Sequence, residues 1–188
     1  MHWKASRLFN GVILAEKVRT RIDKLVYGGD GIGRLPDGRA VFVPFTLPGE
    51  VVELQIVQEG KKFARGRLIN LLEASPERTQ PRCKHFGTCG GCHYQHIPYD
   101  AQLQAKLAIL QDQMDRLGGF SALPSGGITS SPSPWNYRNQ VQFHPAPEGG
   151  LGFMDIDGKS IVPIQECHLP KEGINALWQQ IDLGTEAG

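Results

Sequence analysis

The sequence predicts a mainly β protein with one long helix. A small antiparallel β-barrel comes first, followed by a cysteine-rich segment suited to a metal cluster, the helix, and a partial β domain. Apolar and polar residues alternate between residues 17 and 75, with turn-forming residues about every 8–12 positions, which is typical of small barrels. A helical apolar period occurs within residues 98–118. The 23 glycines and 13 prolines exceed the usual share but stay below that of a disordered chain.

Composition restricts the class of protein. Apolar residues make up 40% and charged residues 21%, as in ordinary soluble proteins. No apolar run approaches the ~18 residues of a membrane span. The first residues also lack the apolar core and cleavage site of a secretion signal. We therefore expect a cytoplasmic protein that makes no contact with membranes.

The net charge of +1 conceals two regions of opposite sign. Residues 1–84 contain 15 Lys and Arg against 9 Asp and Glu, a balance of +6, whereas residues 85–188 contain 5 against 10, a balance of −5. A polyanion would be attracted to the first region and repelled by the second. This asymmetry favours nucleic-acid binding by the first region, although two solvated surfaces of opposite charge would give the same balance.

The barrel is predicted over residues 17–75, after a poorly patterned tail at residues 1–16. Val18, Thr20 and Ile22 alternate with charged residues, which is the period of a half-buried strand. Further strands are expected at residues 39–45, 52–57 and 63–71, with turns at residues 27–34, 35–38, 47–50 and 59–60.

Closely spaced glycines at residues 29–33 raise the question of a phosphate-binding loop. A dinucleotide-binding fingerprint requires a helix directly after the glycines, whereas Pro36 and another predicted strand follow here. A Walker sequence is absent as well. We therefore expect these glycines to let the backbone turn within the barrel.

Basic residues along the predicted barrel form a candidate RNA-binding row. Arg65 and Arg67 share one face of a strand with period 2, and Lys61 and Lys62 lie in the turn before it. Such a row could follow a phosphate backbone, although ordinary surface cations would show the same pattern. The candidate RNA-binding residues of the barrel are Arg34, Arg39, Lys61, Lys62, Arg65 and Arg67.

The second half of the chain is divided into a metal-binding segment at residues 76–97, a helix at residues 98–118 and a partial β domain at residues 119–188. Pro98 suits the first turn of the helix, and Gly118 and Gly119 suit its end. We expect a hairpin at Asp157 and a short helix near Glu172. The long helix carries an apolar stripe that we expect to be partly exposed and to promote self-association; it consists of Leu103, Leu107, Leu110, Met114 and Leu117.

The four cysteines are the candidate metal ligands. Cys83, Cys89 and Cys92 form a C-x5-C-x2-C motif, and Cys167 lies far along the chain. Four thiolates are what a [4Fe–4S] cluster requires. A zinc site of the three clustered cysteines with His96 is the alternative, and the spacing leaves both open. Disulfides are disfavoured in a cytoplasmic protein. The cluster of a radical S-adenosylmethionine enzyme is also disfavoured, because its C-x3-C-x2-C motif has three residues between the first two cysteines and this chain has five.

Several motifs, in their order along the chain, resemble the RNA uracil-5-methyltransferase family, and its cluster-containing 23S rRNA members above all. Residues 22–33 and 41–52, with VFVPF and LPGEVV, resemble a TRAM domain, an OB-like RNA-binding barrel. The cysteine motif with its two glycines, WNYRNQV at residues 135–141, LGF at residues 151–153 and the distant Cys167 follow in the family's order. The resemblance covers about residues 17–183.

The resemblance implies a [4Fe–4S] cluster on Cys83, Cys89, Cys92 and Cys167. It favours the cluster over zinc, with a role in structure and RNA contacts rather than in methyl transfer. It also makes Arg138 a candidate RNA contact, with a structural role as the alternative.

The family's chemistry implies residues that this chain does not provide. In the family, a cysteine thiolate adds to uracil C6, uracil C5 then attacks the methyl group of S-adenosylmethionine, and a glutamate removes the C5 proton. Here the cluster takes all four cysteines and the chain stops at Gly188. We therefore expect the RNA-recognition and cluster portion of a methyltransferase, with rRNA favoured over tRNA, no catalytic residue, and no activity alone. A free-standing RNA-binding protein with a structural zinc or Fe–S site is the alternative.

Overall fold

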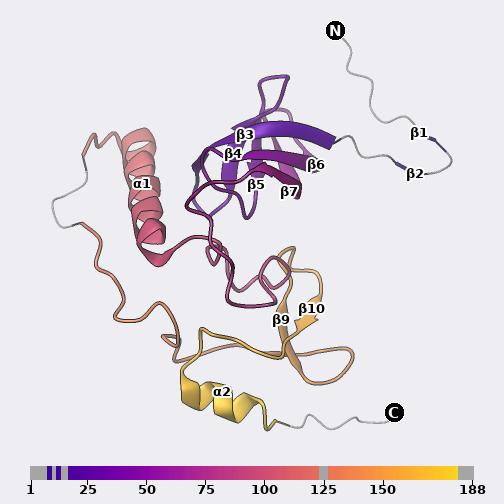
Figure 1. Cartoon of the computed structure of the whole chain (residues 1–188), viewed down its shortest axis with the longest axis vertical. Coiled ribbons are helices and arrows are strands. Elements are labelled where there is room, and N and C mark those ends of the chain that lie inside the picture. The colour runs from indigo at the N-terminus through magenta and orange to yellow at the C-terminus, as the bar shows by residue number, and fades with distance from the viewer. Residues whose placement is uncertain (1–7, 10–11, 14–16, 123–126, 182–188) are drawn as a thin grey trace. The chain divides into compact units, whose positions relative to one another are not determined.

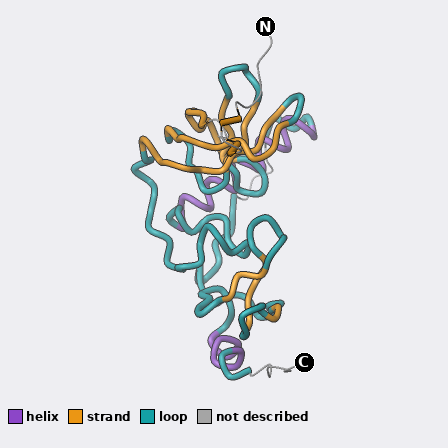
Figure 2. Tube along the Cα trace, turned by 90° about the vertical axis from the view of Figure 1, so that its right-hand side faces the viewer, coloured by secondary structure: helices purple, strands orange, loops and turns teal. Residues whose placement is uncertain are grey.

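The computed structural model describes residues 8–9, 12–13, 17–122 and 127–181. The chain divides into two compact units, Met1–Arg78 and Thr79–Gly188. Its described part is mainly β, with a closed five-stranded barrel in the first unit and two helices in the second (Figure 1). Figure 2 shows that loops make up much of the second unit. No helix in this described part is both long and apolar enough to cross a membrane.

The barrel strands have the order β3-β4-β5-β7-β6. Their bounds are β3 (Lys17–Leu25), β4 (Gly31–Arg34), β5 (Ala40–Val43), β6 (Val51–Glu59) and β7 (Phe63–Glu73). Four neighbouring pairs are antiparallel, as the predicted antiparallel barrel requires, but β5 and β7 run parallel, which the sequence did not predict. A closed ring with an odd number of strands cannot alternate in direction at every pair. One parallel pair is therefore required.

The barrel core comes from the alternation that the sequence shows. In β5, Val41 and Val43 are buried, and in β6 the same holds for Val52 and Leu54. Inward and outward positions alternate along a strand, so each strand contributes one apolar face. The cluster of buried core residues is Ile22, Leu35, Val41, Val43, Val52, Leu54 and Ala64.

The glycines near residue 30 serve two different purposes. Gly28 and Gly29 adopt positive φ angles of 93° and 95° in the turn, as expected. Gly31 and Gly33 instead lie in β4, so the predicted turn at residues 27–34 was too long. A Cβ at Gly31 would lie 2.1 Å from the Thr46 hydroxyl oxygen, which is closer than any real contact. Glycine is needed here because neighbouring atoms fill the space of a side chain.

The second unit contains a long helix, a small sheet and a short helix. Helix α1 (Tyr99–Gly118) begins after Pro98 and ends at Gly119, which has a φ of 68° and donates its N–H to the Asp115 carbonyl. The sheet has the order β10-β9-β8. Its strands are β8 (His144–Pro145), β9 (Leu151–Met154) and β10 (Ile161–Pro163), and helix α2 (Glu172–Trp178) follows.

Two expectations for secondary structure needed correction. The first strands of the second unit were expected from residue 135, but residues 135–143 form no strand. Their backbone bonds to a loop instead: Asn136 N–H donates to His168 O, and Arg138 N–H donates to Leu169 O, at 2.9 Å each. Within the predicted tail, β1 (Leu8–Phe9) and β2 (Val12–Ile13) pair with each other. The rest of residues 1–16 lies outside the described residues.

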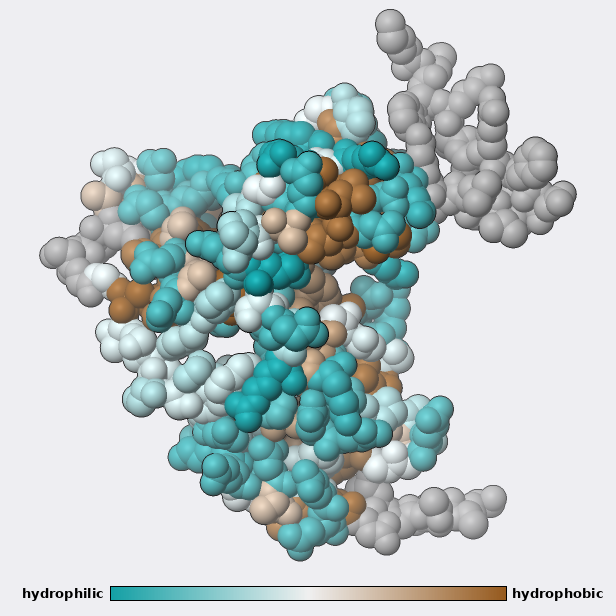
Figure 3. Space-filling model, in the orientation of Figure 1, coloured by the Kyte–Doolittle hydropathy of each residue, from teal (hydrophilic) through white to brown (hydrophobic). Residues whose placement is uncertain are grey.

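Helix α1 keeps its apolar stripe partly in solvent, as the sequence predicts. The helix has no buried residue, and Leu110 and Leu117 are 47% and 80% exposed. Leu103, Leu107 and Met114 are half-buried. The space-filling view likewise shows hydrophobic residues exposed among hydrophilic ones on the face turned to the viewer (Figure 3).

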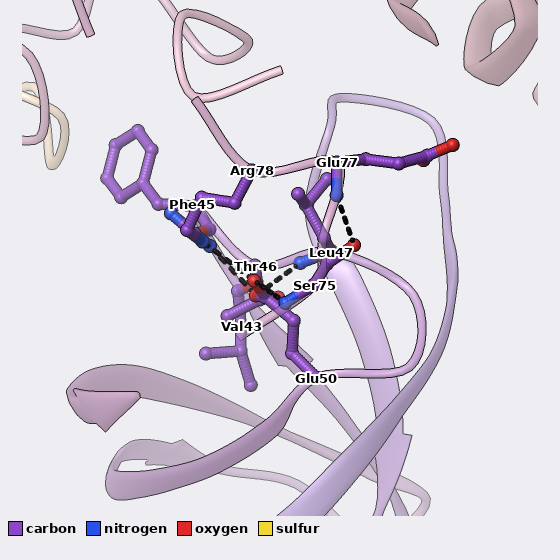
Figure 4. A network of polar contacts seen from close by, with 8 residues as sticks. All are labelled: Val43, Phe45, Thr46, Leu47, Glu50, Ser75, Glu77 and Arg78. Atoms are coloured by element: carbon purple, nitrogen blue, oxygen red, sulfur yellow. Dashed lines mark hydrogen bonds and ion pairs between the residues drawn. The ribbon is translucent and has the colours of Figure 1, made fainter. Parts of the chain in front are cut away.

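A buried carboxylate joins the barrel to the segment that follows it. The Glu50 side chain is fully buried, and its oxygens accept from Leu47 N–H at 2.8 Å and Ser75 N–H at 3.1 Å. The Arg78 guanidinium donates to both oxygens, at 2.7 and 2.8 Å, and also to the Phe45 carbonyl (Figure 4). Burial by itself raises the pKa of Glu50, but these donors outweigh it and lower the pKa below its ordinary value.

We expect Glu50→Gln to lower the free energy of unfolding by about 2–4 kcal/mol near neutral pH, because it leaves Arg78 without its counter-ion. Urea titration at several pH values measures this. The advantage of the wild type should be complete above the unfolded-state pKa of 4.5 and disappear as the pH falls through the lower folded-state pKa. The control is Glu73→Gln, which removes an exposed partner of Arg21 and should leave the midpoint nearly unchanged. Equal effects of the two variants at pH 7 would contradict the assignment.

Candidate functional site

The four cysteines line one cavity in the second unit. Cys83, Cys89 and Cys92 lie in the loop before α1, and Cys167 lies in the loop after β10. All four thiols are free of disulfide bonds. Phe153, Ile164 and Leu169 supply apolar walls, and Arg138 and His168 also contribute to the lining. The distant cysteine is thus brought to the other three, as a common ligand set requires.

Backbone hydrogen bonds attach the cysteine loop to the end of β9. Gly90 N–H donates to the Met154 carbonyl at 2.9 Å, and Ile156 N–H donates to the Thr88 carbonyl at 3.0 Å. A Cβ at Gly90 would lie 2.7 Å from the Asp155 carbonyl oxygen. Glycine is therefore required for the loop to approach the strand, and the approach fixes Cys89 beside it.

A second set of bonds brings the loop of Cys167 to the same place. Gln165 N–H donates to His85 Nε2 at 3.1 Å, and Lys84 N–H donates to a Glu166 carboxylate oxygen at 3.0 Å. The Asn175 side chain donates to the Cys167 carbonyl at 2.9 Å, which connects α2 to the loop. Residues about 80 positions apart in the chain are thereby held side by side.

The thiols influence one another electrostatically. Burial is the main cause that raises the pKa of Cys83, Cys92 and Cys167. The other cysteines raise it further: Cys89 acts on all three, and Cys167 acts on Cys83 and Cys92. Without a bound cation these three thiols favour their protonated form, so ionising them requires compensating positive charge.

Polar groups in the loop provide part of that compensation. Gly91 N–H donates to Cys89 Sγ at 3.4 Å, and the Gln95 amide donates to Cys92 Sγ at 3.2 Å. Gln95 Oε1 also accepts from Cys83 N–H at 3.0 Å. Hydrogen bonds to sulfur favour the thiolate and tune the metal group that it binds.

The histidine of the zinc alternative does not line this cavity. Among the described residues, no three His, Cys, Asp or Glu side chains are arranged to hold a single ion. His96, the histidine of the zinc alternative, is fully buried and stacks on Phe86 with the ring centroids 5.5 Å apart.

The predicted RNA-binding residues of the barrel differ in the hydrogen bonds and ion pairs that their side chains make within the protein. Arg65 and Arg67 alternate with the buried Ala64 and Gly66, so both point outward from β7 as expected. The Arg65 guanidinium forms an ion pair with Asp30, with 3.4 Å between Arg65 Nη1 and Asp30 Oδ2. The side chains of Lys61, Lys62 and Arg67 are exposed and make no hydrogen bond or ion pair with another described residue.

Two arginines are tied to turns of the barrel. Arg34 donates to the Gly38 carbonyl at 3.2 Å and stays exposed. Arg39 is only 25% exposed and bonds Asp37 at 2.7 Å, the Gly60 carbonyl at 3.0 Å and Glu59 at 3.4 Å. The guanidinium of Arg39 thus joins the two turns at the ends of neighbouring strands.

Sequence reasoning missed a larger pocket that lies wholly in the second unit. It has a volume of about 640 Å³ and is lined by residues from Thr79 to Leu169. Arg138 lines both this pocket and the thiol cavity, and its side chain donates to the Gly91 carbonyl at 3.4 Å. Arg82 and Trp135 are in contact in this pocket, but they lie 53 positions apart in the sequence and show no joint pattern there.

Comparison with known proteins gives the barrel a family. Residues 15–69 match the TRAM domain. The chain is 40% identical over 160 residues to an uncharacterized RNA methyltransferase of Aquifex aeolicus, covering 85% of this chain and 37% of that protein. It is 34% identical over 178 residues to the 23S rRNA (uracil(1939)-C(5))-methyltransferase RlmD of Shewanella denitrificans, covering 90% and 38%.

A solved structure shows the same relationship. The Pyrococcus abyssi tRNA (uracil-54, C5)-methyltransferase, in complex with S-adenosyl-L-homocysteine, matches with a TM-score of 0.53 and 26% identity, over 82% of this chain and 33% of that one. The chain spans a little over one third of the length of the curated relatives that it matches. The resemblance found in the sequence is confirmed: residues 15–69 match the TRAM domain, and 85–90% of the chain is similar to RNA methyltransferases.

Proposed function

We propose that this chain is the RNA-recognition and [4Fe–4S] part of a cytoplasmic, S-adenosylmethionine-dependent RNA uracil-C5 methyltransferase. The observation that carries the proposal is the convergence of all four cysteines on one cavity, in the unit that follows a TRAM domain. 23S rRNA is the favoured substrate, since identity to the rRNA enzyme is 34% and identity to the tRNA enzyme is 26%.

The number of cysteines in the cavity supports a cluster. Four thiolates are what a [4Fe–4S] cluster requires, and all four cysteines of the chain line this cavity. His96, the fourth ligand of the zinc alternative, does not line it. This donor set fits the cluster.

The residues around the thiols have defined tasks in this proposal. Cys83, Cys89, Cys92 and Cys167 would hold the cluster, which when bound supplies positive iron centres that stabilise the thiolates. Phe153, Ile164 and Leu169 exclude water from it. Gln95 and Gly91 N–H donate to the sulfurs and orient them. Arg138 opposes the burial that raises the pKa of Cys92 and Cys167, and its positive charge favours their ionised form.

Methyl transfer itself requires groups that these residues do not supply. Addition of a thiolate to uracil C6 needs a free cysteine, and all four cysteines of this chain are assigned to the cluster. We therefore expect the chain alone to bind RNA without methylating it.

The surface of the barrel supports RNA binding through phosphate contacts. Lys61, Lys62 and Arg67 are exposed cations without a partner among the described residues, and Arg65 points outward beside them. Cations of this kind displace the counter-ions of a nucleic acid and bind it with little dependence on sequence.

The metal content of the purified protein tests the cluster. Protein purified without oxygen should be brown and contain iron and acid-labile sulfide in nearly equal amounts. Cys167→Ser should lose the colour and the iron, and lower the melting temperature, since metal binding contributes folding free energy. The control His93→Gln, which changes an exposed imidazole in the same segment, should retain both. Stoichiometric zinc without sulfide would refute the cluster.

RNA binding by the row of barrel cations should depend on the salt concentration. Removing the four exposed cations of the row should weaken binding of a short RNA and flatten the slope of log affinity against log salt by up to about 3. The variant replaces Lys61, Lys62, Arg65 and Arg67 with Ala. Fluorescence anisotropy at several salt concentrations gives the slope. As control, Lys159→Ala and Lys171→Ala remove exposed cations of the second unit, outside the row. A slope equal to that of the wild type would show that the row is not in contact with RNA.

The apolar stripe of α1 makes a second copy of the chain a candidate partner. Leu110 is 47% exposed on the stripe of α1, and burying a leucine contributes about 1.5–3 kcal/mol. We propose that the stripe drives self-association of the chain, visible in sedimentation velocity at rising concentration. Leu110→Glu should restore the monomer, whereas Gln104→Glu, an exposed change off the stripe, should not. A wild type that stays monomeric would contradict this role of the stripe.

A further inference from the structure

We propose that the larger pocket of the second unit binds one unpaired base of single-stranded RNA together with its phosphate. The pocket has a volume of about 640 Å³, within the range of ligand sites. This inference rests on the proposed function, because it takes RNA as the ligand. It goes further by assigning a base-binding pocket, with its stacking rings and cations, to the unit whose charge balance is negative.

Aromatic rings supply the stacking surfaces of the pocket. Tyr94, Tyr99, Trp135 and Tyr137 all line it, and Tyr137 is 51% exposed. The Arg82 guanidinium lies 5.2 Å from the centroid of the Trp135 ring. Bases of single-stranded RNA stack on aromatic rings and on arginine planes alike. The pocket thus offers two kinds of planar surface to a base.

The charge of the pocket favours a phosphate. Arg82, Lys106 and Arg138 line it, and none of its lining residues is Asp or Glu. Residues 79–188 as a whole contain 7 Lys and Arg and 10 Asp and Glu, a balance of −3. Cations are therefore concentrated in the pocket while carboxylates lie elsewhere in the unit. This separation attracts an anionic ligand to one place on an otherwise acidic unit.

Hydrogen bonds hold the walls of the pocket in place. The Gln102 amide donates to the carbonyls of Tyr94 and Ile97, which attaches the first turn of α1 to the preceding segment. Ser131 N–H donates to the Tyr99 hydroxyl at 2.7 Å and closes the loop of residues 128–134 onto the helix. The pocket is therefore formed before any ligand arrives, which reduces the entropy lost on binding.

Polar groups that could read a base edge lie among the lining residues. Gln80, Thr129 and Ser133 are exposed there and present amide and hydroxyl groups. Unpaired bases are recognised through hydrogen bonds to their edges and through stacking on their faces. In a duplex the edges are paired and the faces are stacked, so a pocket reaches neither. Rings, cations and polar groups together fit an unpaired nucleotide better than an acidic peptide, which would not use the rings.

The test compares a labelled single-stranded 10-nucleotide RNA with a duplex of the same length, using fluorescence anisotropy on the full chain. Tyr137→Leu removes an exposed ring from the pocket, and its matched control Phe120→Leu removes an exposed ring outside it. Lys106→Gln removes a cation of the pocket, and Lys159→Gln is its control. Circular dichroism spectra establish that each variant is folded.

Tyr137→Leu should weaken single-strand binding about tenfold, in line with the loss of one stacked base, and leave duplex binding unchanged. Lys106→Gln should lower the salt slope by about one. If both variants equal their controls while the wild type binds RNA through the barrel, this inference is wrong and the proposed function stands. A wild type that binds no RNA refutes both.

A second measurement needs no variant. Single-stranded RNA that contains 4-thiouridine is crosslinked to the wild-type chain by ultraviolet light, and the modified peptides are identified by mass spectrometry. Crosslinks at residues 94–99 or 135–138 support the pocket. Crosslinks confined to barrel peptides overturn it, because the base would then lie elsewhere.

Discussion

The buried carboxylate of Glu50 is the interaction on which the first unit depends most. Its carboxylate is fully buried, so water does not solvate it. The charge must therefore be paired within the protein. Its oxygens hold the turn before β6 through Leu47 and the exit of β7 through Ser75, while Arg78 binds both oxygens and the Phe45 carbonyl. One side chain therefore determines where the barrel closes and where the chain leaves it.

The second unit has few regular elements and relies on loops held by hydrogen bonds. The cysteine loop is attached to the end of β9 by backbone bonds at Thr88 and Gly90, and the loop of Cys167 is attached through His85 and Glu166. These bonds prepare a ligand set whose thiols favour the protonated form until a cation arrives. Under the proposed function, binding of a metal group would further stabilise these loops, since metal binding contributes folding free energy.

Cations in this protein are clustered at particular sites. The net charge of a long segment does not reveal these clusters. In the barrel, Lys61, Lys62, Arg65 and Arg67 are exposed along β7 and the turn before it, while Arg39 joins two turns. The second unit is acidic as a whole, yet its larger pocket is lined by Arg82, Lys106 and Arg138 without any carboxylate. Because electrostatic attraction falls off within about 10 Å in salt, a ligand responds to this local arrangement rather than to the sum.

The sequence by itself determined the features that depend on near neighbours. Period-2 alternation predicted β3, β5, β6 and β7. The apolar stripe with Gly118 and Gly119 predicted α1, and the C-x5-C-x2-C motif identified the candidate ligands. Only the tertiary structure decided what depends on chain closure: the parallel β5–β7 pair, the strand at Gly31, the docking of residues 135–143 on a loop, and the pocket. Local patterns record which face of an element is apolar. They do not record which distant segment covers that face, because the pairing is set by the geometry of the whole unit.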